Sequence, residues 1–529
     1  VSRRGFLRAA GGVVAGGLGA PALIGCAGAP GRSWSKGDPF GLGVAAGEPS
    51  SDGFVLWTRL APEPLAVDPA TPGGMSGGDI RIGYEIAEDP AMRKVVRQGT
   101  ANAEAAYGHS VHLEVQGLPS GRPYWYRFTS GDAQSRVGRT MTAPAAGAPL
   151  SRFRFGCVSC ANYEVGYFAA YRHLADEQPD LVLFLGDYIY EYIETRRPTV
   201  RKHSDGVPAT TLATYRNRYA QYRLDPDLQR LHAEVPALMT WDDHEVQNDY
   251  AGQWSELFAP PERFLRRRAA AYQAYYEHMP VRPSRAMPHG PSMRLYERFD
   301  FGDLVRMSLL DGRQYRSREA CYGPPNRGGG HVETDDSCPE LRAADRSMIG
   351  TTQEAWLFEG LAGSPTCSQV IGRDVLMAQL RERQTDGNIG FWTDDWNGYP
   401  ASRDRLLQHL ATAPVRNPVV FSGDIHSFWC NELKQDFNDP ASTTLATEFV
   451  GTSVTSNPPP YELFRKFLPD NPHVRFFESR KRGYISVDLT PTEMTTRFRA
   501  IADAKDPRTG VATLQTFVVQ DGRPRPLIG

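Results

Sequence analysis

Short segments in which apolar and polar residues alternate fill the chain from about residue 40 to 145. They read GFVLWTRL, DIRIGYEIA, SVHLEVQGL and RPYWYRFTSG, and turns rich in Gly, Pro and Asp separate them. A period of two is typical of strands that bury one face. The pattern therefore predicts a small antiparallel β-sandwich domain over 38–143, followed by a linker, TAPAAGAPLS, at 142–151.

From residue 150 onward, apolar strands alternate with segments of helical spacing. FRFGCVSC and PDLVLFLGD are predicted strands, and YEVGYFAAYRHLADEQ, at 163–178, is a predicted helix between them. Further strands are predicted at ALMTW, FGDLVRMSLLD and NPVVFSGD, and a further helix at DVLMAQLRERQ, 374–384. The order predicts an α/β domain over 150–500 that contains right-handed strand-helix-strand units, with strands and a polar C-terminal tail over 501–529.

Residues that bind metals or phosphate follow four of these predicted strands. They are, in chain order, Cys157 and Cys160, Asp187 and Tyr190, Asp242 with Asp243 and His244, and Asp424 with His426. Open α/β sheets hold ligands beyond the carboxyl ends of their strands, so these side chains are expected to converge. Neighbouring carboxylates repel one another unless a cation neutralises them. The sequence therefore predicts a metal centre.

Each of these pieces also has a simpler explanation. A Gly-Asp pair after a strand is often a turn or a helix cap, WDDHE could be a solvated acidic turn, and His426 could be a satisfied buried histidine. The spacing of Cys157 and Cys160 fits a redox pair, but their thiols follow a strand, so a thiolate on the metal centre is the better interpretation. GCVSC also departs from the nucleophile pattern of serine hydrolases at its last position.

Composition and charge narrow the possible functions. The chain has 529 residues, of which 40% are hydrophobic, enough for two or more packed domains. The 59 basic and 61 acidic residues give a net charge of -2, so no nucleic-acid-binding patch is expected and an anionic substrate must be held locally.

The first 30 residues are predicted to be an export signal. The segment resembles a twin-arginine signal, which directs folded proteins to the twin-arginine export machinery. The resemblance rests on Ser2, Arg3, Arg4, Phe6 and Leu7. The apolar stretch is rich in Gly and shorter than the roughly 20 residues that span a bilayer, which disfavours an anchor helix. LIGC resembles a lipoprotein cleavage box ending at Cys26, with ordinary cleavage just beyond it as the alternative. The mature protein is therefore expected in the periplasm or at the cell surface, with a lipid tether if Cys26 is modified.

A second pair of cysteines lies in a stretch from 316 to 345 that is rich in Gly and Arg. Cys321 and Cys338 flank GPPNRGGGH, and a disulfide between them would close this loop, although the sequence does not fix the pairing. Arg316, Arg318 and Arg327 could line a substrate channel or solvate a loop, and we favour the loop.

Several of these motifs together resemble the PhoD family of alkaline phosphatases and phosphodiesterases, over about 38–490. The motifs are LGVAAGEPSSDGFVLWTRL near the N-terminus, SCAN at 159–162, FLGDYIYE at 184–191, TWDDHE at 240–245, LLDGRQYR at 309–316, DWNGYP at 395–400 and FSGDIHSFW at 421–429. The resemblance implies a metallophosphoesterase core, in which two β-sheets lie between helices, carrying Fe³⁺ and Ca²⁺.

The same resemblance implies roles for particular residues. Asp187 would bridge the metals, and Cys160, Tyr190 and Asp424 would bind iron, since Fe³⁺ prefers anionic oxygen donors such as a phenolate. Tyr188 and Tyr192 are expected to pack rather than to bind metal.

The second metal position and the catalytic set follow from the resemblance too. Asp243, Asn248 and His426 would lie at or beside the second metal. His244 would face the phosphate and the leaving oxygen, and the implied catalytic residues are His244, Asp187 and Asn248.

The implied function is that of an exported, metal-dependent phosphoric ester hydrolase acting on small-molecule or lipid phosphate esters. A hydroxide held by the metals would attack phosphorus without a covalent intermediate. One alternative is a phospholipase D-type hydrolase on the same fold, with an acyl or base group held by Trp392, Trp396, Tyr399, Phe428 or Trp429. Another is a non-catalytic surface-binding lipoprotein, in which the β-sandwich binds and the α/β domain is structural.

Overall fold

The computed structural model describes residues 33–324 and 328–529. The predicted export signal at 1–30, with Cys26, and also Arg327 lie outside these residues. In the described part of the chain, no helix combines the length and the apolar character needed to cross a bilayer.

The largest sheet has ten strands in the order β25-β24-β23-β22-β9-β10-β11-β1-β2-β5. Its strands are β1 (Val44–Ser50), β2 (Gly53–Arg59), β5 (Ser110–Val115), β9 (Phe153–Val158), β10 (Leu181–Leu185), β11 (Ala237–Thr240), β22 (Arg482–Leu489), β23 (Glu493–Ile501), β24 (Val511–Gln520) and β25 (Arg523–Ile528). The central strands β9, β10, β11 and β1 run parallel. Strands covered on both faces read as continuous apolar runs, which explains LVLFL in β10.

A second sheet of seven strands has the order β12-β13-β15-β18-β20-β19-β21. Its strands are β12 (Glu297–Phe301), β13 (Val305–Leu309), β15 (Ser368–Gly372), β18 (Pro418–Ser422), β19 (Phe428–Lys434), β20 (Thr444–Val450) and β21 (Val474–Glu478). Strands β13, β15, β18 and β20 run parallel. A small sheet joins β14 (Val332–Glu333), β17 (Ile389–Trp392) and β16 (Glu382–Arg383).

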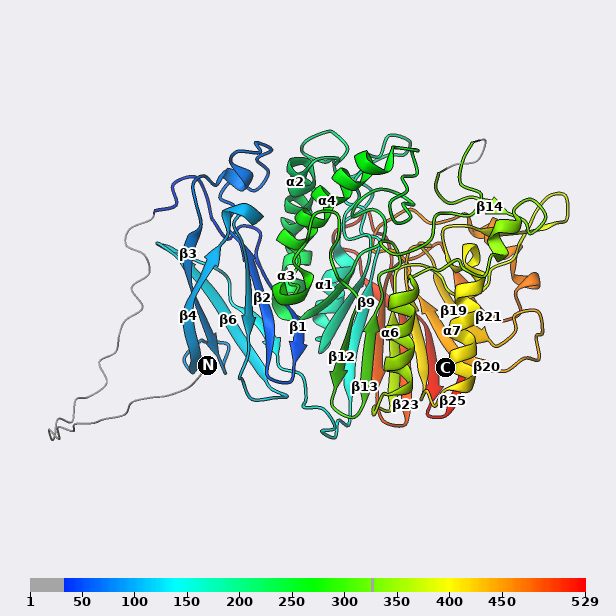
Figure 1. Cartoon of the computed structure of the whole chain (residues 1–529). Coiled ribbons are helices and arrows are strands. Elements are labelled where there is room, and N and C mark those ends of the chain that lie inside the picture. Colours follow the sequence, from blue (N-terminus) through cyan, green and yellow to red (C-terminus); the bar gives the residue numbers. More distant parts are fainter. Residues whose placement is uncertain (1–32, 325–327) are drawn as a thin grey trace, which may run out of the picture.

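The two large sheets pack face to face around an apolar core, as the alternation along β10 illustrates. Leu183 points into this core, where Phe155 of β9 meets Phe421 of β18 with ring centroids 5.3 Å apart. Val182 and Phe184 point the other way, toward the helices. The predicted α/β architecture, two sheets between helices, is therefore observed (Figure 1).

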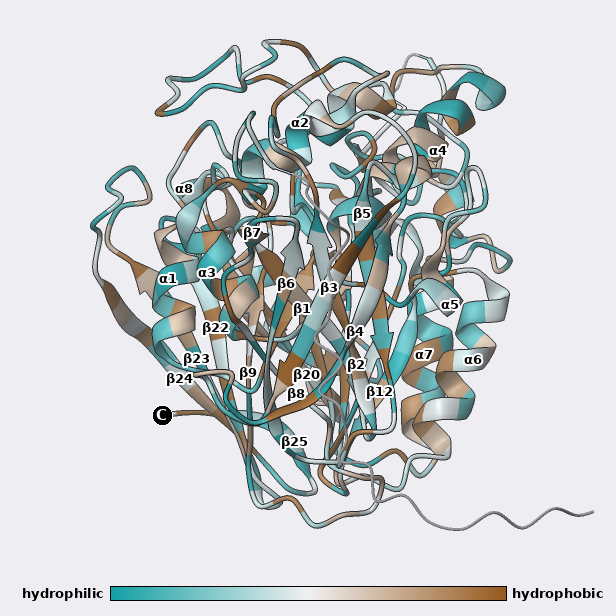
Figure 2. Cartoon of the chain, turned by 90° about the vertical axis from the view of Figure 1, so that its left-hand side faces the viewer, coloured by the Kyte–Doolittle hydropathy of each residue, from teal (hydrophilic) through white to brown (hydrophobic). Residues whose placement is uncertain are grey.

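Helices cover the outer faces of both sheets. The α-helices are α1 (Ala169–Asp176), α2 (Leu212–Arg223), α3 (Pro226–Glu234), α4 (Pro261–His278), α5 (Pro283–Ala286), α6 (Thr351–Ala362), α7 (Pro400–Thr412) and α8 (Tyr461–Arg465), and the 3-10 helices are η1 (Pro72–Gly74), η2 (Ala105–Tyr107), η3 (Pro339–Arg342), η4 (Trp396–Gly398) and η5 (Leu468–Asp470). Helices α1 to α4 pack on the ten-stranded sheet, and α6 and α7 pack on the seven-stranded sheet. Figure 2 shows that α6 and α7 carry both hydrophilic and apolar residues.

The N-terminal strands form a second β-β packing. Strands β3 (Ile80–Ala87), β4 (Val95–Ala103), β6 (Pro123–Ser130), β7 (Ala133–Gln134) and β8 (Gly138–Met141) make a separate sheet. It packs on β1, β2 and β5 through residues such as Ile86 and Tyr126 against Leu56. However, β1 also pairs with β11, at Gly47 and Ala237, so the expected β-sandwich shares a sheet with the rest of the molecule. A Cβ at Gly47 would lie 2.2 Å from the Pro280 carbonyl oxygen, so this close approach requires glycine.

One expectation from the sequence was wrong, and two were met in part. Residues 374–384 form no helix. Residues 374–381 are a largely buried loop, in which the N–H groups of Met377 and Ala378 donate to the Glu448 carboxylate, at 2.7 and 2.9 Å, and Glu382–Arg383 form β16. Helix α1 covers only 169–176 of the predicted 163–178. The strands expected within 501–529 are present as β24 and β25, which join the ten-stranded sheet and occupy most of the segment expected to be a polar tail.

The stretch from 316 to 345 is also different from a solvated loop. Cys321 and Cys338 form the disulfide that the sequence made possible. Arg316 is buried and pairs with Asp394, at 2.8 Å, whereas Arg318 pairs with Glu340 nearer the surface.

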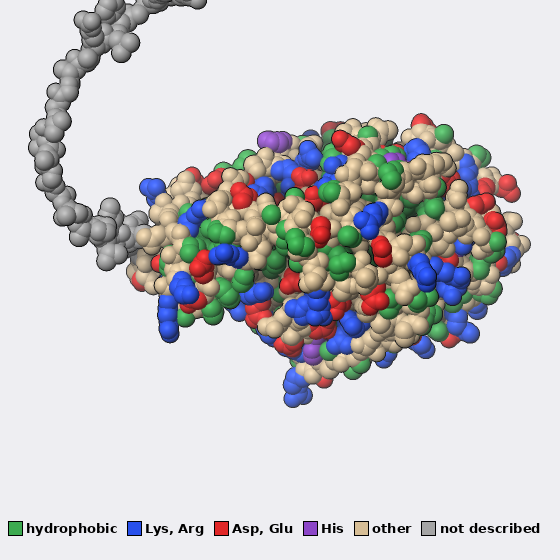
Figure 3. All heavy atoms as spheres, turned by 90° about the horizontal axis from the view of Figure 1, so that it is seen from below, with side chains coloured by type: hydrophobic (Ala, Val, Ile, Leu, Met, Phe, Trp, Pro, Cys, Tyr) green, Lys and Arg blue, Asp and Glu red, His purple; other side chains and the backbone are tan. Residues whose placement is uncertain are grey.

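On the face of the molecule seen in Figure 3, acidic and basic side chains are interspersed.

Replacing Phe421 tests the packing between the two large sheets. Phe421→Ala is expected to lower the free energy of unfolding by about 3–5 kcal/mol, because it removes a fully buried ring that contacts Phe155 across the core. Urea unfolding followed by circular dichroism measures the loss. Phe258→Ala, at a ring that is 41% exposed, is the matched control and should cost less than about 1 kcal/mol. Equal losses in the two variants would contradict this account of the core.

Candidate metal centre

The loops that leave β9, β10, β11 and β18 meet at one end of the two-sheet core. Cys160 N–H donates to the Gly186 carbonyl oxygen, at 3.2 Å, which joins the first two loops. The loop after β18 arrives from the other sheet, and a Cβ at Gly423 would lie 2.5 Å from Ser159 Oγ. Only glycine allows these two loops to touch so closely, so the meeting of the sheets itself assembles the site.

Four side chains of the predicted site stand on strained backbone. Positive φ values, between 53° and 64°, occur at Cys160, Asp187, Asp424 and His426. For residues with a Cβ this conformation costs on the order of 1–3 kcal/mol each, and such residues cluster at functional sites. The surrounding packing therefore holds these side chains in orientations that free loops would avoid.

Two groups of ligand-type atoms share Asp187. In one group, atoms of Cys160, Asp187 and His426 all lie within 4.8 Å of one another, and in the other the same holds for Asp187, Asp243 and His244. A carboxylate common to two such groups occupies the position that a bridging ligand would take. His426 lies with Cys160 in the first of these groups.

Tyr190 completes the first group. Its hydroxyl donates to Asp187 Oδ2, at 2.8 Å, and lies 3.0 Å from His426 Nε2. His426 Nδ1 donates to the Asn457 carbonyl oxygen, at 2.8 Å, which leaves the Nε2 lone pair directed at Tyr190 and Asp187. Ser456 Oγ donates to the Tyr190 oxygen, at 2.7 Å.

The electrostatics of the site favour a bound cation. Burial raises the pKa of Asp187 well above its usual value, and Asp243 and Glu245 add to the effect while His244 opposes it. Asp187 Oδ1 is buried and has no hydrogen-bond partner among the described residues. Burial likewise raises the pKa of the Cys160 thiol, so this sulfur is protonated unless a cation displaces the proton. A metal ion would satisfy the orphan oxygen and neutralise the crowded acids, so the residues fit the group that the sequence predicts.

His244 lies among three acids at this centre. Burial acts to lower the pKa of His244, but Asp243, Asp187 and Glu191 outweigh it, and the pKa is raised well above its usual value. Glu191 Oε2 accepts the Nδ1–H of His244, at 2.7 Å, and Glu191 Oε1 accepts the backbone N–H of Asn248, at 2.9 Å. One carboxylate therefore fixes two of the predicted catalytic residues.

The remaining predicted residues are less central. Asp424 stands at the end of β18, where burial, then Asp394 and Asp243, raise its pKa to about 7, but it belongs to neither group of ligand-type atoms. Asn248 lines the cavity beside the site. Cys157 packs in the core between the sheets, so it is neither a ligand nor the partner of Cys160 in a redox pair.

Two of the tyrosines that follow Asp187 lie in different surroundings, one in the core and one at the cavity. Tyr188 packs in the core beneath the helices, and its hydroxyl lies 3.0 Å from His232 Nε2. Tyr192, expected to pack, lines the cavity instead, and Asn162 donates to its hydroxyl, at 3.1 Å. Of the aromatic residues proposed for an acyl or base group, four are fully buried in the core: Trp396, Tyr399, Phe428 and Trp429.

Several supporting residues escaped the sequence analysis. The Glu245 carboxylate accepts the N–H groups of Tyr188, at 2.6 Å, and Asp242, at 2.9 Å, and so ties the loop after β10 to the loop after β11. Arg313 pairs with both Asp242 and Asp394, at 2.5 and 2.6 Å. Glu191 and Glu245 stand inside the motifs FLGDYIYE and TWDDHE, which was a usable signal, whereas no pattern marks Ser456 and Asn457.

An open cavity of about 800 Å³ leads away from the centre. Its lining includes His426, Ser456 and Asn248 and also the exposed Arg196 and Arg197. A second cavity of about 900 Å³ shares Arg267 and other lining residues with the first, so the two form one continuous cleft. An ester could therefore approach the centre with a long substituent lying in the cleft.

Comparison with known proteins identifies similar chains. The family model described as PhoD-like phosphatase matches residues 155–498, and the model described as PhoD-like phosphatase, N-terminal domain, matches residues 25–144. Alkaline phosphatase D of Bacillus subtilis (strain 168) is 41% identical over 489 residues, which cover 91% of this chain and 81% of that relative. A solved structure described as "Structure of PhoD" has a TM-score of 0.87 and 40% identity, covering 94% of this chain and 93% of the other.

Removing Asp187 should empty both groups of ligand-type atoms. Asp187→Ala is expected to lower the metal content at least about tenfold, because it deletes the shared ligand, while the loss of one buried acid should leave the fold intact. Inductively coupled plasma mass spectrometry on protein dialysed without chelators measures the metal. Asp176→Ala, at an exposed carboxylate on α1, is the control. Equal metal content in the wild type and both variants would show that Asp187 holds no metal.

Proposed function

Because this chain belongs to the PhoD-like phosphatase family, we propose that it is an exported, metal-dependent hydrolase of phosphoric esters, an alkaline phosphatase or phosphodiesterase. The observation that carries the proposal is the sharing of Asp187 by two groups of ligand-type atoms, one of which includes His244. The alkaline phosphatase D relative supports the same class of reaction.

The metals proposed are Fe³⁺ and Ca²⁺. Cys160, Tyr190 and Asp187 would hold iron, with His426 and Asp424 beside it, since a phenolate and carboxylates suit a hard trivalent ion. Asp187 and Asp243 would hold calcium, with the side-chain oxygen of Asn248 nearby, since calcium takes oxygen ligands. The chemistry that such ions supply when bound is polarisation of a water molecule and neutralisation of charge on the phosphoryl oxygens.

The protein groups have distinct tasks in this reaction. His244 carries a proton on a ring that Glu191 orients, so it can donate to the oxygen of the departing alcohol. Asn248, fixed through its backbone by the same carboxylate, faces the cavity where a phosphoryl oxygen would lie. No covalent intermediate on the protein is required, since the nucleophile is water.

The arginines of the cleft extend this proposal to the rest of the substrate. Arg196 and Arg197 are exposed, and their guanidinium groups make no ion pair within the described ranges 33–324 and 328–529. Arg267 is held by Tyr215, whose hydroxyl accepts from its Nε at 2.8 Å. These cations would attract an anionic ester and accommodate the second substituent of a diester.

Export and division of the chain are further parts of the proposal. Residues 1–30 would direct folded protein through the twin-arginine machinery to the periplasm or cell surface, and Cys26 would carry a lipid tether. Residues 38–143 and 150–500 would act as an N-terminal and a catalytic unit. Folding before export suits a site in which buried Cys160 and Tyr190 must lose protons to a metal.

His244→Ala provides the main test. The variant is expected to hydrolyse bis(p-nitrophenyl) phosphate about 10²–10⁴ times more slowly than wild type at saturation, because the proton donor is removed. Its metal content is measured in parallel, because His244 also belongs to one of the groups of ligand-type atoms. His289→Ala, at an exposed histidine, is the matched control.

Other substrates separate the competing functions in the same experiment. Wild-type protein that carries its metals but hydrolyses neither this diester, nor p-nitrophenyl phosphate, nor phosphatidylcholine vesicles would contradict the proposal and favour a surface-binding lipoprotein. Activity confined to the vesicles would favour the phospholipase D-type alternative.

Glu191→Gln tests the orientation of His244. The amide keeps an acceptor for Asn248 but not the charge that stabilises the imidazolium, so kcat should fall about 10–100-fold with KM nearly unchanged. Steady-state kinetics on the same diester measure both constants. Glu194→Gln in the same loop, where the carboxylate accepts the backbone N–H groups of Arg196 and Arg197, should stay near wild type. If the two variants had equal kcat values, Glu191 would have no special role.

A further inference from the structure

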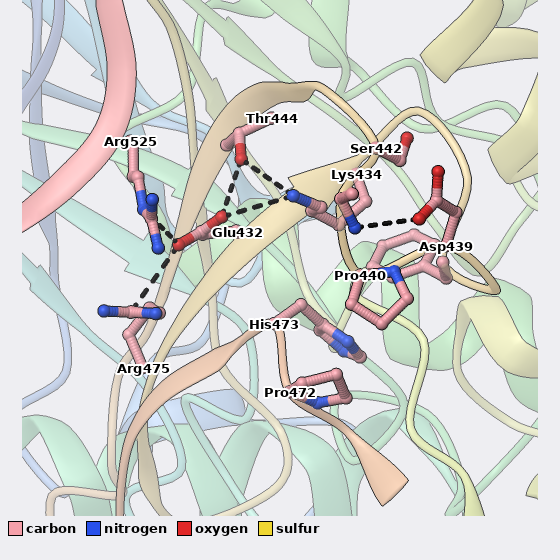
Figure 4. Close-up of a pocket in the computed structure, with 12 residues that line it drawn as sticks. Glu432, Lys434, Asp439, Pro440, Ser442, Thr444, Pro472, His473, Arg475 and Arg525 are labelled. Atoms are coloured by element: carbon pink, nitrogen blue, oxygen red, sulfur yellow. Dashed lines mark hydrogen bonds and ion pairs between the residues drawn. The ribbon is translucent and has the colours of Figure 1, made fainter.

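A separate, smaller cavity lies at the far end of β19 from the metal centre. His426 lies two residues before β19, whereas Lys434 ends it, so the two sites are on the order of 20 Å apart along the strand. The cavity has a volume of about 270 Å³, and its walls come from β19, the 435–444 loop, the 472–475 segment and β25 (Figure 4). None of these segments takes part in the proposed reaction.

Positive charge is in excess in this cavity, which we call the β19 cavity. Three cations, Lys434, Arg475 and Arg525, converge on the single buried carboxylate of Glu432, at 3.6, 3.5 and 2.9 Å. Figure 4 shows Glu432 between the two guanidinium groups on one side and Lys434 on the other. The other lining carboxylate, Asp439, is exposed and accepts the N–H of Ala441 in its own loop, at 2.9 Å.

His473 forms a neutral wall of the β19 cavity. Burial lowers its pKa to about 4, and its Nε2–H donates to the Gln379 carbonyl oxygen, at 2.7 Å. His473 therefore adds no charge near pH 7, and the three cations face only two carboxylates.

Lys434 has fewer partners than its burial requires. The residue is only 7% exposed, and it faces the protein and the cavity rather than the open surface. An ammonium group has three N–H donors, but Lys434 Nζ makes one long hydrogen bond, to Thr444 Oγ1 at 3.4 Å, and one long ion pair with Glu432. A buried donor that lacks partners is costly, and an anion in the cavity would supply them.

The two arginines of the β19 cavity also have N–H donors that the protein does not use. Arg525 uses Nε for Glu432, and Arg475 faces the same carboxylate through Nε. Within residues 33–324 and 328–529, the terminal nitrogens of both guanidinium groups have no hydrogen-bond partner in the protein. Such forked donors match the oxygen spacing of phosphate and sulfate.

We propose that the β19 cavity is a binding site for a small tetrahedral oxyanion, inorganic phosphate or sulfate, separate from the metal centre. Lys434 and the free ends of Arg475 and Arg525 would donate to its oxygens, and the Ser442 hydroxyl, at the rim, would add a further donor. The volume accommodates one such ion with a few waters but not a long ester. The proposal does not depend on the reaction catalysed at the metal centre.

Calorimetric titration of the metal-loaded full chain with inorganic phosphate tests this site. Wild-type protein should show a binding step that Lys434→Met abolishes and Arg525→Gln weakens about tenfold, because each variant removes donors from the β19 cavity. Repeating the titration with sulfate distinguishes the two anions. In both variants, kcat for the diester should be unchanged, because neither residue belongs to the metal centre.

Two further comparisons make the outcome decisive. Lys466→Met removes an exposed lysine outside the cavity and should leave the isotherm as in wild type. Arg525 has a side chain that is 62% exposed, so its variant keeps the test valid even if Lys434→Met fails to fold. Phosphate and sulfate isotherms that are the same in wild type, Arg525→Gln and Lys466→Met would overturn the proposal.

Discussion

The burial of one acidic side chain, Asp187, among other acids is the constraint on which the centre of this molecule depends. Its carboxylate is 1% exposed, one of its oxygens has no partner in the described residues, and it is the member common to both groups of ligand-type atoms. Such a group destabilises the fold unless something positive joins it. The surrounding structure is arranged accordingly: Arg313 pairs with Asp242 and Asp394 nearby, and the acids around His244 raise its pKa.

The two-sheet architecture provides this arrangement with little help from local structure. Residues separated by almost 300 positions, from Cys160 to Ser456, meet because parallel strands of both sheets end on the same side. Gly186 and Gly423 let these strand ends approach, and Glu245 ties two of the loops together by their backbone. The cost of left-handed backbone at the ligand positions is offset by this network, which gives the loops few alternative conformations.

The fold class and the central part of the site were predictable because both follow from short, local patterns of apolar and polar residues in the sequence. Apolar runs such as LVLFL mark strands buried on both faces, and Asp187, Asp243, His244 and His426 follow such runs directly. The failures have a common cause, which is that distant partners decide the outcome. Glu448 satisfies the backbone near Met377, and so a segment with helical spacing becomes a buried loop. In the same way, Asp394 draws Arg316 into the interior, and the positions of Ser456 and Asn457 are set by contacts that no sequence period encodes.

The pairing of β1 with β11 has a consequence for how the chain can be divided. The family models separate an N-terminal part from the rest, yet β1, β2 and β5 are the outermost strands on that side of the ten-stranded sheet. A shortened protein that begins in the linker at 142–151 would lack β1. The edge of β11 would then be exposed, with unpaired backbone groups on a strand whose residues are all buried in the intact chain. Exposed apolar edges of this kind recruit strands from other molecules. The N-terminal strands therefore cover an edge that would otherwise promote self-association, and this effect is separate from any role in recognising substrate.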